Sequence, residues 1–179
     1  MNKIAMAQDW KDKVVFYNGQ IVPKGAATVK ILLEEGIKHV AILDVNEEAG
    51  KSLQDELNEK YGDNRVKFIK CDVFDEDQLM NSFHAVLEEQ GYIDVVVNYA
   101  FLMNDSKETY KKMINLNFVK FMSKENGGSG GTIINFTSIL TLFQSELLPI
   151  YSATKSAISM FSNCIGVSKY SSKLPVPAH

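Results

Sequence analysis

The sequence predicts an α/β fold in which one parallel sheet is wrapped on both faces by helices, and three observations support this. Short apolar runs alternate along the chain with segments of helical periodicity. The apolar runs are nearly continuous, as in IDVVV at 93–97, which is typical of strands covered on both faces. The chain has 179 residues, 45% of them hydrophobic, which is enough for a substantial core. We therefore expect a doubly wound sheet of five strands in the order 3-2-1-4-5, within a single domain over 1–179.

The first half of the chain supplies three strands and three helices. The expected strands are 13–17, 39–43 and 66–71, and the expected helices are 25–35, 46–60 and 75–89. Asn46 is the predicted N-cap of the second helix, with Glu47 and Glu48 in a first turn where the helix dipole favours acids. Asp75 with Gln78 resembles a capping box at the start of the third.

The second half continues the alternation. A strand over 93–97, a helix over 106–124, a flexible GGSGG connection at 127–131, a strand over 132–136 and a helix over 149–169 are expected. The apolar positions of the last helix are Ile150, Ala153, Ala157, Ile158, Phe161 and Ile165. Residues 1–12 are an expected N-terminal arm, and 170–179 an expected frayed tail.

Composition and charge exclude several classes of function. A net charge of −3 provides no basic field for nucleic acid or anionic lipid. No apolar run approaches the roughly 20 residues of a membrane helix, and the polar N-terminus does not resemble a secretory signal. The two cysteines, Cys71 and Cys164, are expected to be buried, reduced thiols, which indicates a cytoplasmic protein. The three histidines show no metal-ligand spacing, so no metal site is expected.

Candidate ligand-binding residues follow the strands, because such sheets bind ligands beyond the carboxyl ends of their strands. Gly19 and Gly25 bracket the segment after the first strand, where glycines let backbone approach a pyrophosphate; an ordinary turn is the alternative. Asp44 ends the second strand, where a carboxylate binds ribose hydroxyls and repels a 2′-phosphate, favouring NAD over NADP; helix capping is the alternative. Asp72 follows the third strand, facing an adenine edge or serving as a turn residue.

The most specific pattern combines Ser138 with Tyr151 and Lys155. Tyr151 and Lys155 are four residues apart and share one helix face, while Ser138 follows the fifth strand, 13 residues before Tyr151. A nearby ammonium stabilises phenolate and lowers the pKa of a tyrosine, which can then exchange a proton with an alcohol or carbonyl. A strand-end hydroxyl can hold that same oxygen. A tyrosine and a lysine at this spacing, taken alone, are common on surfaces.

These stretches resemble the short-chain dehydrogenase/reductase family. Similarity extends to about residue 165 and includes HVAILDVNEEAG, IDVVVNYA, INLN and PIYSATKSA. Within the family the chain is most similar to the NAD-dependent 15-hydroxyprostaglandin dehydrogenases and the insect alcohol dehydrogenase group. The resemblance implies a Rossmann-like fold and NAD-dependent oxidoreduction of a small secondary alcohol or ketone, hydrophobic in character.

The resemblance also implies roles for individual residues. Tyr151 would be the acid/base, Lys155 would lower its pKa and hold the nicotinamide ribose, Ser138 would bind the reacting oxygen, and Asn115 would anchor a water molecule. The implied cofactor-binding positions are Gly19 and Gly25 for the pyrophosphate, Asp44 for the adenine ribose, Asp72 and Val73 for the adenine, Asn98 for bracing the central strand, Ala100 beside the cofactor, and again Tyr151 and Lys155.

The chain departs from the family pattern at several places. Asn18 replaces the threonine and Pro23 the middle glycine of the glycine motif. The family's Asn-Asn-Ala-Gly segment after the fourth strand reads Asn98-Tyr99-Ala100-Phe101. The helix with Asn115, which implies a homodimer in the family, is shortened, and the family fold is incomplete at the C-terminal end. The alternative interpretation is therefore an impaired truncated isoform or a non-catalytic binding protein of this type.

Overall fold

A computed structural model describes residues 9–19, 25–100, 131–143 and 146–168, and its chain divides into two compact units. Unit 1 comprises Met1–Phe101 with Leu116–Ile134, and unit 2 comprises Leu102–Asn115 with Asn135–His179. The expected helix over 106–124, the connection before residue 131, the tail over 170–179, and Pro23, Phe101 and Asn115 lie outside the described residues. The single domain over 1–179 stays a prediction.

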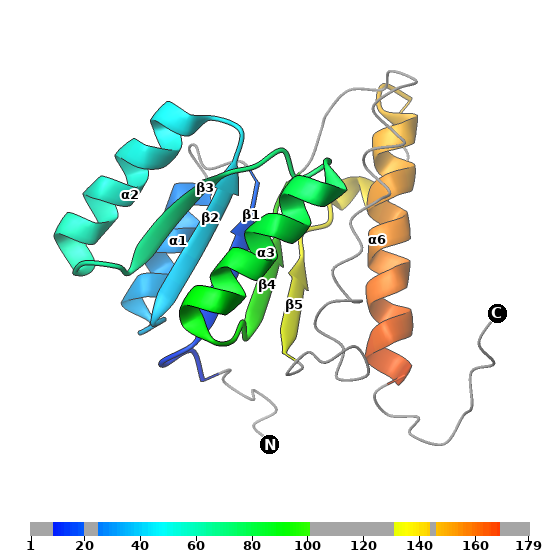
Figure 1. Ribbon diagram of the computed structural model, residues 1–179. Coiled ribbons are helices and arrows are strands. Elements are labelled where there is room, and N and C mark those ends of the chain that lie inside the picture. The colour runs from blue at the N-terminus through cyan, green and yellow to red at the C-terminus, as the bar shows by residue number, and fades with distance from the viewer. Residues whose placement is uncertain (1–8, 20–24, 101–130, 144–145, 169–179) are drawn as a thin grey trace. The chain divides into compact units, whose positions relative to one another are not determined.

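The sheet has five strands in the order β3-β2-β1-β4-β5, which confirms the predicted topology (Figure 1). The strands are β1 (Val14–Asn18), β2 (His39–Asp44), β3 (Val66–Lys70), β4 (Val95–Asn98) and β5 (Thr132–Asn135). β1 pairs in parallel with β2 and β4, and β2 with β3. Asn18, the last residue of β1, stands opposite Leu43 and Asn98, so the carboxyl ends of the central strands meet at one edge.

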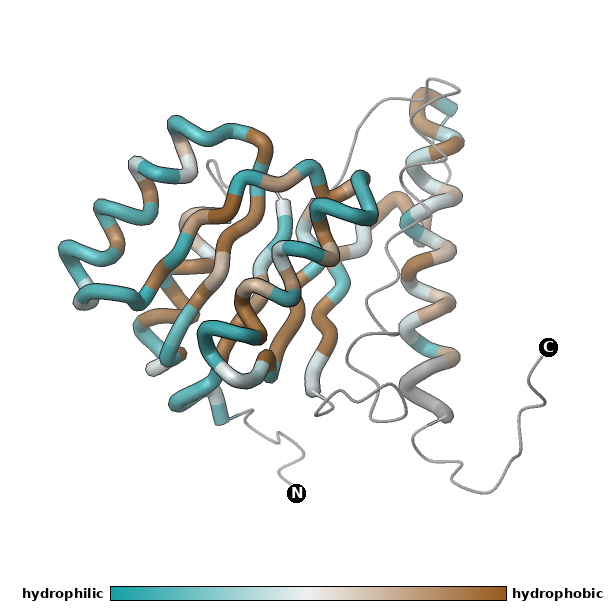
Figure 2. The backbone as a smooth tube through the Cα atoms, in the orientation of Figure 1, coloured by the Kyte–Doolittle hydropathy of each residue, from teal (hydrophilic) through white to brown (hydrophobic). Residues whose placement is uncertain are grey.

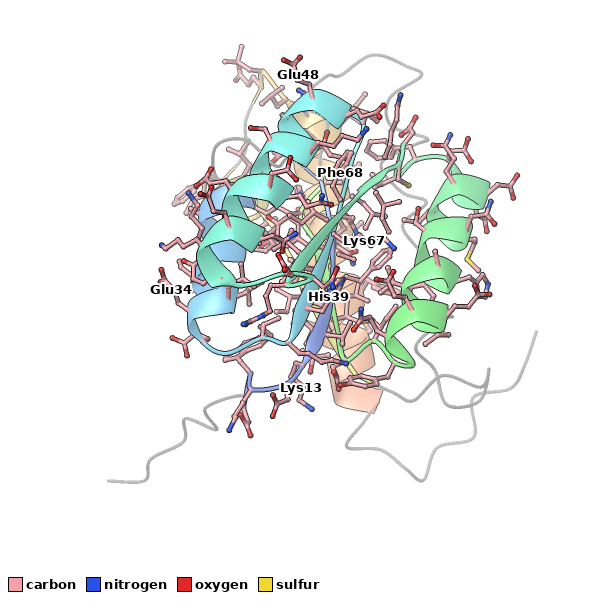
Figure 3. The ribbon with its side chains drawn as sticks, turned by 60° about the vertical axis from the view of Figure 1, so that its left-hand side comes forward. Lys13, Glu34, His39, Glu48, Lys67 and Phe68 are labelled. Carbon is pink, nitrogen blue, oxygen red and sulfur yellow. The ribbon has the colours of Figure 1, made fainter. Side chains whose placement is uncertain are left out.

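The three helices of unit 1 cover both faces of this sheet. α1 (Ala26–Glu34) and α2 (Glu47–Tyr61) lie on one face and α3 (Glu76–Gln90) on the other (Figure 3). An ion pair between Lys30 and Glu56, at 2.7 Å, joins α1 to α2. Gly50 lets α2 approach β3 closely, since a Cβ at this position would lie 2.2 Å from the ring of Phe68.

Both predicted N-caps are confirmed. Asn46 Oδ1 accepts a hydrogen bond from the Ala49 backbone at 3.1 Å, and Asp75 Oδ1 accepts one from the Gln78 backbone at 3.1 Å. The second half of the capping box differs from the expected pattern. Gln78 donates to the Asp75 carboxylate at 2.8 Å and accepts from the Asp72 backbone at 3.1 Å. Its amide therefore ties the start of α3 to the turn that follows β3.

The core of unit 1 lies on both faces of the sheet. All five residues of β1 are buried, as expected for a central strand covered on two sides. Phe16 meets Phe83 of α3 edge to face, with ring centroids 5.4 Å apart. Figure 2 shows the hydrophobic strands of unit 1 and the mostly hydrophilic course of α2.

Unit 2 contains the short helix η3 (Ile139–Thr141) and α6 (Pro149–Ser168). Three of the apolar positions of α6, Ala153, Ala157 and Phe161, are exposed. The buried side chains are instead Tyr151, Thr154 and Lys155, since polar contacts with the segment after β5 hold this face. Among the residues of unit 2 that the structure describes, the other exposed large hydrophobic side chains are Ile139, Leu142, Phe143, Leu147 and Met160.

The two cysteines differ in environment. Cys71 is buried in the core of unit 1, whereas Cys164 is exposed, so the expectation of two buried thiols is wrong for Cys164. Both thiols are free. Within the described ranges, no helix combines the length and apolar character needed to cross a membrane. The same residues contain no group of three or more His, Cys, Asp or Glu side chains arranged to hold a metal ion.

Candidate active site

The carboxyl ends of the first four strands are joined by backbone hydrogen bonds in unit 1. Gly19 donates to the Leu43 carbonyl at 3.0 Å, Tyr99 donates to that of Asn18 at 2.9 Å, and Cys71 donates to that of Asp44 at 3.0 Å. The residues that follow β1, β2, β3 and β4 are therefore neighbours along one edge. The structure thus brings Gly19, Asp44, Asp72 and Ala100 to the edge at which such sheets bind nucleotides.

The backbone requires glycine at one of the two positions that bracket the segment after β1, but not at the other. Gly19 has a φ of +96°, and a Cβ there would lie 2.2 Å from the Ala100 Cα, so both its conformation and the close approach of two chain segments require it. Gly25 has helical angles, φ −62° and ψ −42°, and precedes α1 without any side-chain cap. The first turn of α1 therefore leaves its backbone N–H groups without a side-chain acceptor from this position.

Asn18 ends β1 and is fully buried. Its side-chain amide donates to Asn98 Oδ1 at 2.7 Å, and its own oxygen accepts from the Ala100 backbone at 3.5 Å. Asn18 therefore connects the end of β1 to the end of β4. From the sequence alone, Asn18 was identified only as a departure from the family's glycine motif. The sequence feature that could have predicted this contact is a polar residue at the end of an apolar strand, with Asn98 at the same place on another strand.

The acidic residues at the end of β2 and after β3 both accept backbone hydrogen bonds in turns. Asp44 Oδ1 accepts from the Asn46 backbone at 2.9 Å, and Asp72 Oδ1 accepts from the Phe74 backbone at 3.1 Å. The turn interpretation of Asp72 is therefore realised, whereas the helix-capping alternative for Asp44 is not, because the N-cap of α2 is Asn46. The side chain of Val73 belongs to the hydrophobic core together with Cys71.

Tyr99 occupies a position at which the resemblance leads one to expect an asparagine. Its ring is buried and stacks on that of Tyr17, with centroids 5.9 Å apart and an interplanar angle of 28°. The substitution therefore adds to the packing of unit 1.

Ser138, Tyr151 and Lys155 all belong to unit 2. Ser138 precedes η3, and its Oγ accepts from the Leu140 backbone at 3.2 Å. Tyr151 and Lys155 lie one turn apart on α6 and are 7% and 3% exposed. The Lys155 ammonium lies 5.9 Å from the centroid of the Tyr151 ring. Asn115, the fourth expected catalytic residue, lies outside the described residues.

Lys155 is held by a backbone group. Its Nζ donates to the carbonyl oxygen of Phe136 at 2.8 Å, just after β5. Burial lowers the pKa of Lys155, because removal from water penalises the charged form. The arrangement presents a desolvated cation beside a phenol ring. The Phe136 carbonyl was not foreseen, since a backbone acceptor leaves no mark in side-chain identity.

Comparison with known proteins assigns the family. A profile described as short chain dehydrogenase matches residues 13–176. Among solved structures, NAD⁺-bound xylitol dehydrogenase has the same fold, with a TM-score of 0.74 and 22% identity over 90% of this chain and 66% of that chain.

Curated relatives point the same way. The 15-hydroxyprostaglandin dehydrogenase [NAD(+)] of Macaca fascicularis is 36% identical over 160 residues, which are 84% of this chain and 59% of that protein. Alcohol dehydrogenase 1 of Ceratitis cosyra is 30% identical, over 88% of this chain and 64% of that protein. The chain thus spans about three fifths of the length of the former relative. The expected resemblance is confirmed: the chain belongs to the short-chain dehydrogenase/reductase family.

Proposed function

We propose that this chain acts as an NAD-dependent oxidoreductase on a small, hydrophobic secondary alcohol or ketone. The observation that carries the proposal is the buried Lys155 ammonium, 2.8 Å from the Phe136 carbonyl and 5.9 Å from the Tyr151 ring centroid. In the oxidative direction Tyr151 takes the proton of the alcohol, Lys155 stabilises the resulting charge, and Ser138 holds the reacting oxygen. NAD supplies the hydride acceptor when it is bound.

The strand ends of unit 1 have groups suited to that cofactor. Gly19 presents backbone without a side chain, and α1 begins at Gly25 with N–H groups suited to a pyrophosphate. Asp44 is an acceptor-only carboxylate, suited to the two hydroxyls of an adenine ribose. We assign the adenine side to Asp72 and Val73, the bracing of β4 to Asn98, and a position beside the cofactor to Ala100. The same proposal includes Asn115 as the anchor of a water molecule next to Lys155.

A second candidate is a non-catalytic protein that binds little or no nucleotide. Pro23 favours it, because proline has no N–H for a phosphate and has a fixed φ. Phe101 favours it as well, since a large ring replaces the glycine that the family pattern has there. The homodimer implied by the resemblance and the cytoplasmic location indicated by the cysteines stay predictions.

Titration with NADH, followed by its fluorescence, separates the two candidates. For the enzyme we expect a dissociation constant tighter than about 100 μM, within the range of ordinary enzyme affinities. Asp44→Asn should weaken NADH binding. It should also reduce the ratio of NADH affinity to NADPH affinity, because it removes the charge that repels a 2′-phosphate. Asp63→Asn is the matched control, an equal change of charge at an exposed residue after α2. Absence of NADH binding in the wild-type chain would reject the enzyme.

Turnover is then measured on a panel of hydrophobic secondary alcohols and ketones. Tyr151→Phe should lose roughly 10²–10⁴-fold in turnover at saturating NAD, the usual contribution of a positioned acid/base. Undiminished turnover in Tyr151→Phe would reject Tyr151 as the acid/base. NADH binding without turnover on any substrate would favour a non-catalytic binding protein that retains the nucleotide.

A further inference from the structure

A second polar contact joins the end of β5 to α6 within unit 2. The side-chain amide of Asn135 donates to Ser162 Oγ at 3.0 Å. The next residue along the chain, Phe136, receives the hydrogen bond from Lys155. Residues 155 and 162 are seven positions apart, about two turns, so they lie within roughly 20° of each other around the helix axis. The two contacts therefore fall on one face of α6.

The hydrogen bonds of Ser162 have a defined direction. Its hydroxyl donates to the carbonyl of Ile158, one turn earlier, at 2.8 Å. With its only proton committed to that bond, the oxygen is left to Asn135 as an acceptor. Alanine at position 162 would leave the half-buried amide of Asn135 without this acceptor, whereas threonine keeps the hydroxyl.

The two segments run in opposite directions past each other, since the earlier residue of the strand end meets the later residue of α6. Asn135 meets Ser162, and Phe136 meets Lys155, so the chain after β5 advances towards the N-terminal part of α6. Ser138 lies two residues beyond Phe136, and Tyr151 lies one turn before Lys155. The contact at Ser162 thus lies on the same face of α6 as the contact of Lys155 with the segment that leads to Ser138.

We propose that Asn135 and Ser162 form a positioning pair for the proton-transfer site, holding α6 in the register at which Lys155 reaches the Phe136 carbonyl. This inference rests on the proposed function, because Lys155 needs a fixed place only if Tyr151 is catalytic. Both residues act on the site through the placement of α6. Loss of the pair frees α6 to shift along the strand end, which separates Lys155 from its carbonyl and admits water to the ammonium.

The test follows Lys155 itself by NMR, on the full chain labelled with ¹³C at the lysine ε carbon. Lys155→Met assigns the signal. In the wild-type chain Lys155 should titrate below the exposed lysines, because it is buried. Ser162→Ala and Asn135→Ala should each move that titration upwards by about half a pH unit or more, towards the ordinary lysine value. Ser162→Thr should restore the wild-type titration.

Ser156→Ala is the matched control, because Ser156 is an exposed serine next to Lys155 on the same helix. It should leave the Lys155 titration unchanged. If Ser162→Ala does not fold, as judged by circular dichroism, Asn135→Ala tests the same bond from the strand side. A Lys155 titration that stays at the wild-type position in the folded variants overturns the proposal, and so does a Ser162→Thr variant that behaves like Ser162→Ala.

The double variant Asn135→Ala/Ser162→Ala tests whether the two residues act as a pair. A shift no larger than that of either single variant supports a shared bond, and additive shifts contradict it. NADH titration of the same proteins separates this inference from the proposed function. A shifted Lys155 titration in the variants, together with no NADH binding, would keep the positioning pair and reject the enzyme. NADH binding together with an unshifted Lys155 titration would keep the enzyme and reject the positioning pair.

Discussion

At the scale of single residues, Gly19 is under two constraints at once. Its φ is +96°, and a Cβ would lie 2.2 Å from the Ala100 Cα. Gly91, at the end of α3, has a similar φ of +82°, but nothing lies within 4 Å of the place that a Cβ would take. Gly91→Ala should therefore cost about 1–2 kcal/mol of unfolding free energy from backbone strain alone. Gly19→Ala should cost about 1–3 kcal/mol more, since the end of β4 has to move.

Urea unfolding of the two glycine variants beside the wild-type chain measures this difference. Equal losses in the two variants would show that the contact between Gly19 and Ala100 contributes nothing beyond backbone strain. A larger loss for Gly19→Ala would support the tight junction between the ends of β1 and β4.

His39, at the start of β2, predicts a dependence of stability on pH. The ring is 2% exposed, and its Nδ1 lies 2.8 Å from the Asn64 carbonyl. Burial lowers the pKa of His39 below its ordinary value of 6.5, opposed by the Asn64 contact and the charge of Glu89 and reinforced by Lys67 and Lys38. The folded chain therefore binds this proton less readily than the unfolded chain. Its contribution to stability is complete above pH 6.5 and falls as the pH drops below that value.

The measurement is the unfolding free energy in urea at pH 7.5 and at pH 5.5. His39→Gln should lose less stability than the wild-type chain between these two values, because glutamine takes up no proton. His84→Gln, at an exposed residue of α3, is the control and should follow the wild-type chain. A wild-type pH dependence that persists unchanged in His39→Gln would assign it to other groups.

At the scale of elements, the N-cap of α2 is the interaction with the clearest expected effect. Asn46 Oδ1 accepts from the Ala49 backbone at 3.1 Å, so Asn46→Ala leaves an N–H of the first turn without its acceptor. The expected loss is about 1 kcal/mol of unfolding free energy. Asn81→Ala, at an exposed interior position of α3, should be neutral or slightly stabilising because alanine has the higher helix propensity. Similar losses in both variants would contradict the capping role.

The helices α2 and α3 were predicted well from local sequence, and their N-caps explain why. Asn46 and Asp75 act on backbone groups three residues away, and such interactions depend on neighbouring residues alone. α6 shows the opposite case. Its extent was predicted closely, but its polar contacts were not, because Lys155 and Ser162 find their partners in a separate segment, at Phe136 and Asn135.

At the scale of the whole molecule, the two units differ in core. Among the described residues, Tyr151 is the one buried hydrophobic side chain of unit 2, whereas unit 1 contains all the others. Regions with little buried apolar surface open at lower free energy. Backbone amides of β1, β2 and β4 should therefore exchange with deuterium more slowly than those of α6, as measured by hydrogen exchange and mass spectrometry. Equal protection would indicate one cooperative unit and support the predicted single domain.

The sequence by itself determined the class of fold, the strand order, the caps of two helices and the family. Each of these depends on periodicity, on neighbouring residues or on a motif of fixed spacing, and all of these are contained in the linear order. Tertiary structure decided what Asn18, Phe136 and Ser162 do, because their partners are 19 to 82 residues away or are backbone atoms without a side-chain signature. Pairing across such separations follows from the register of the sheet and the rotation of α6, which only the folded chain specifies.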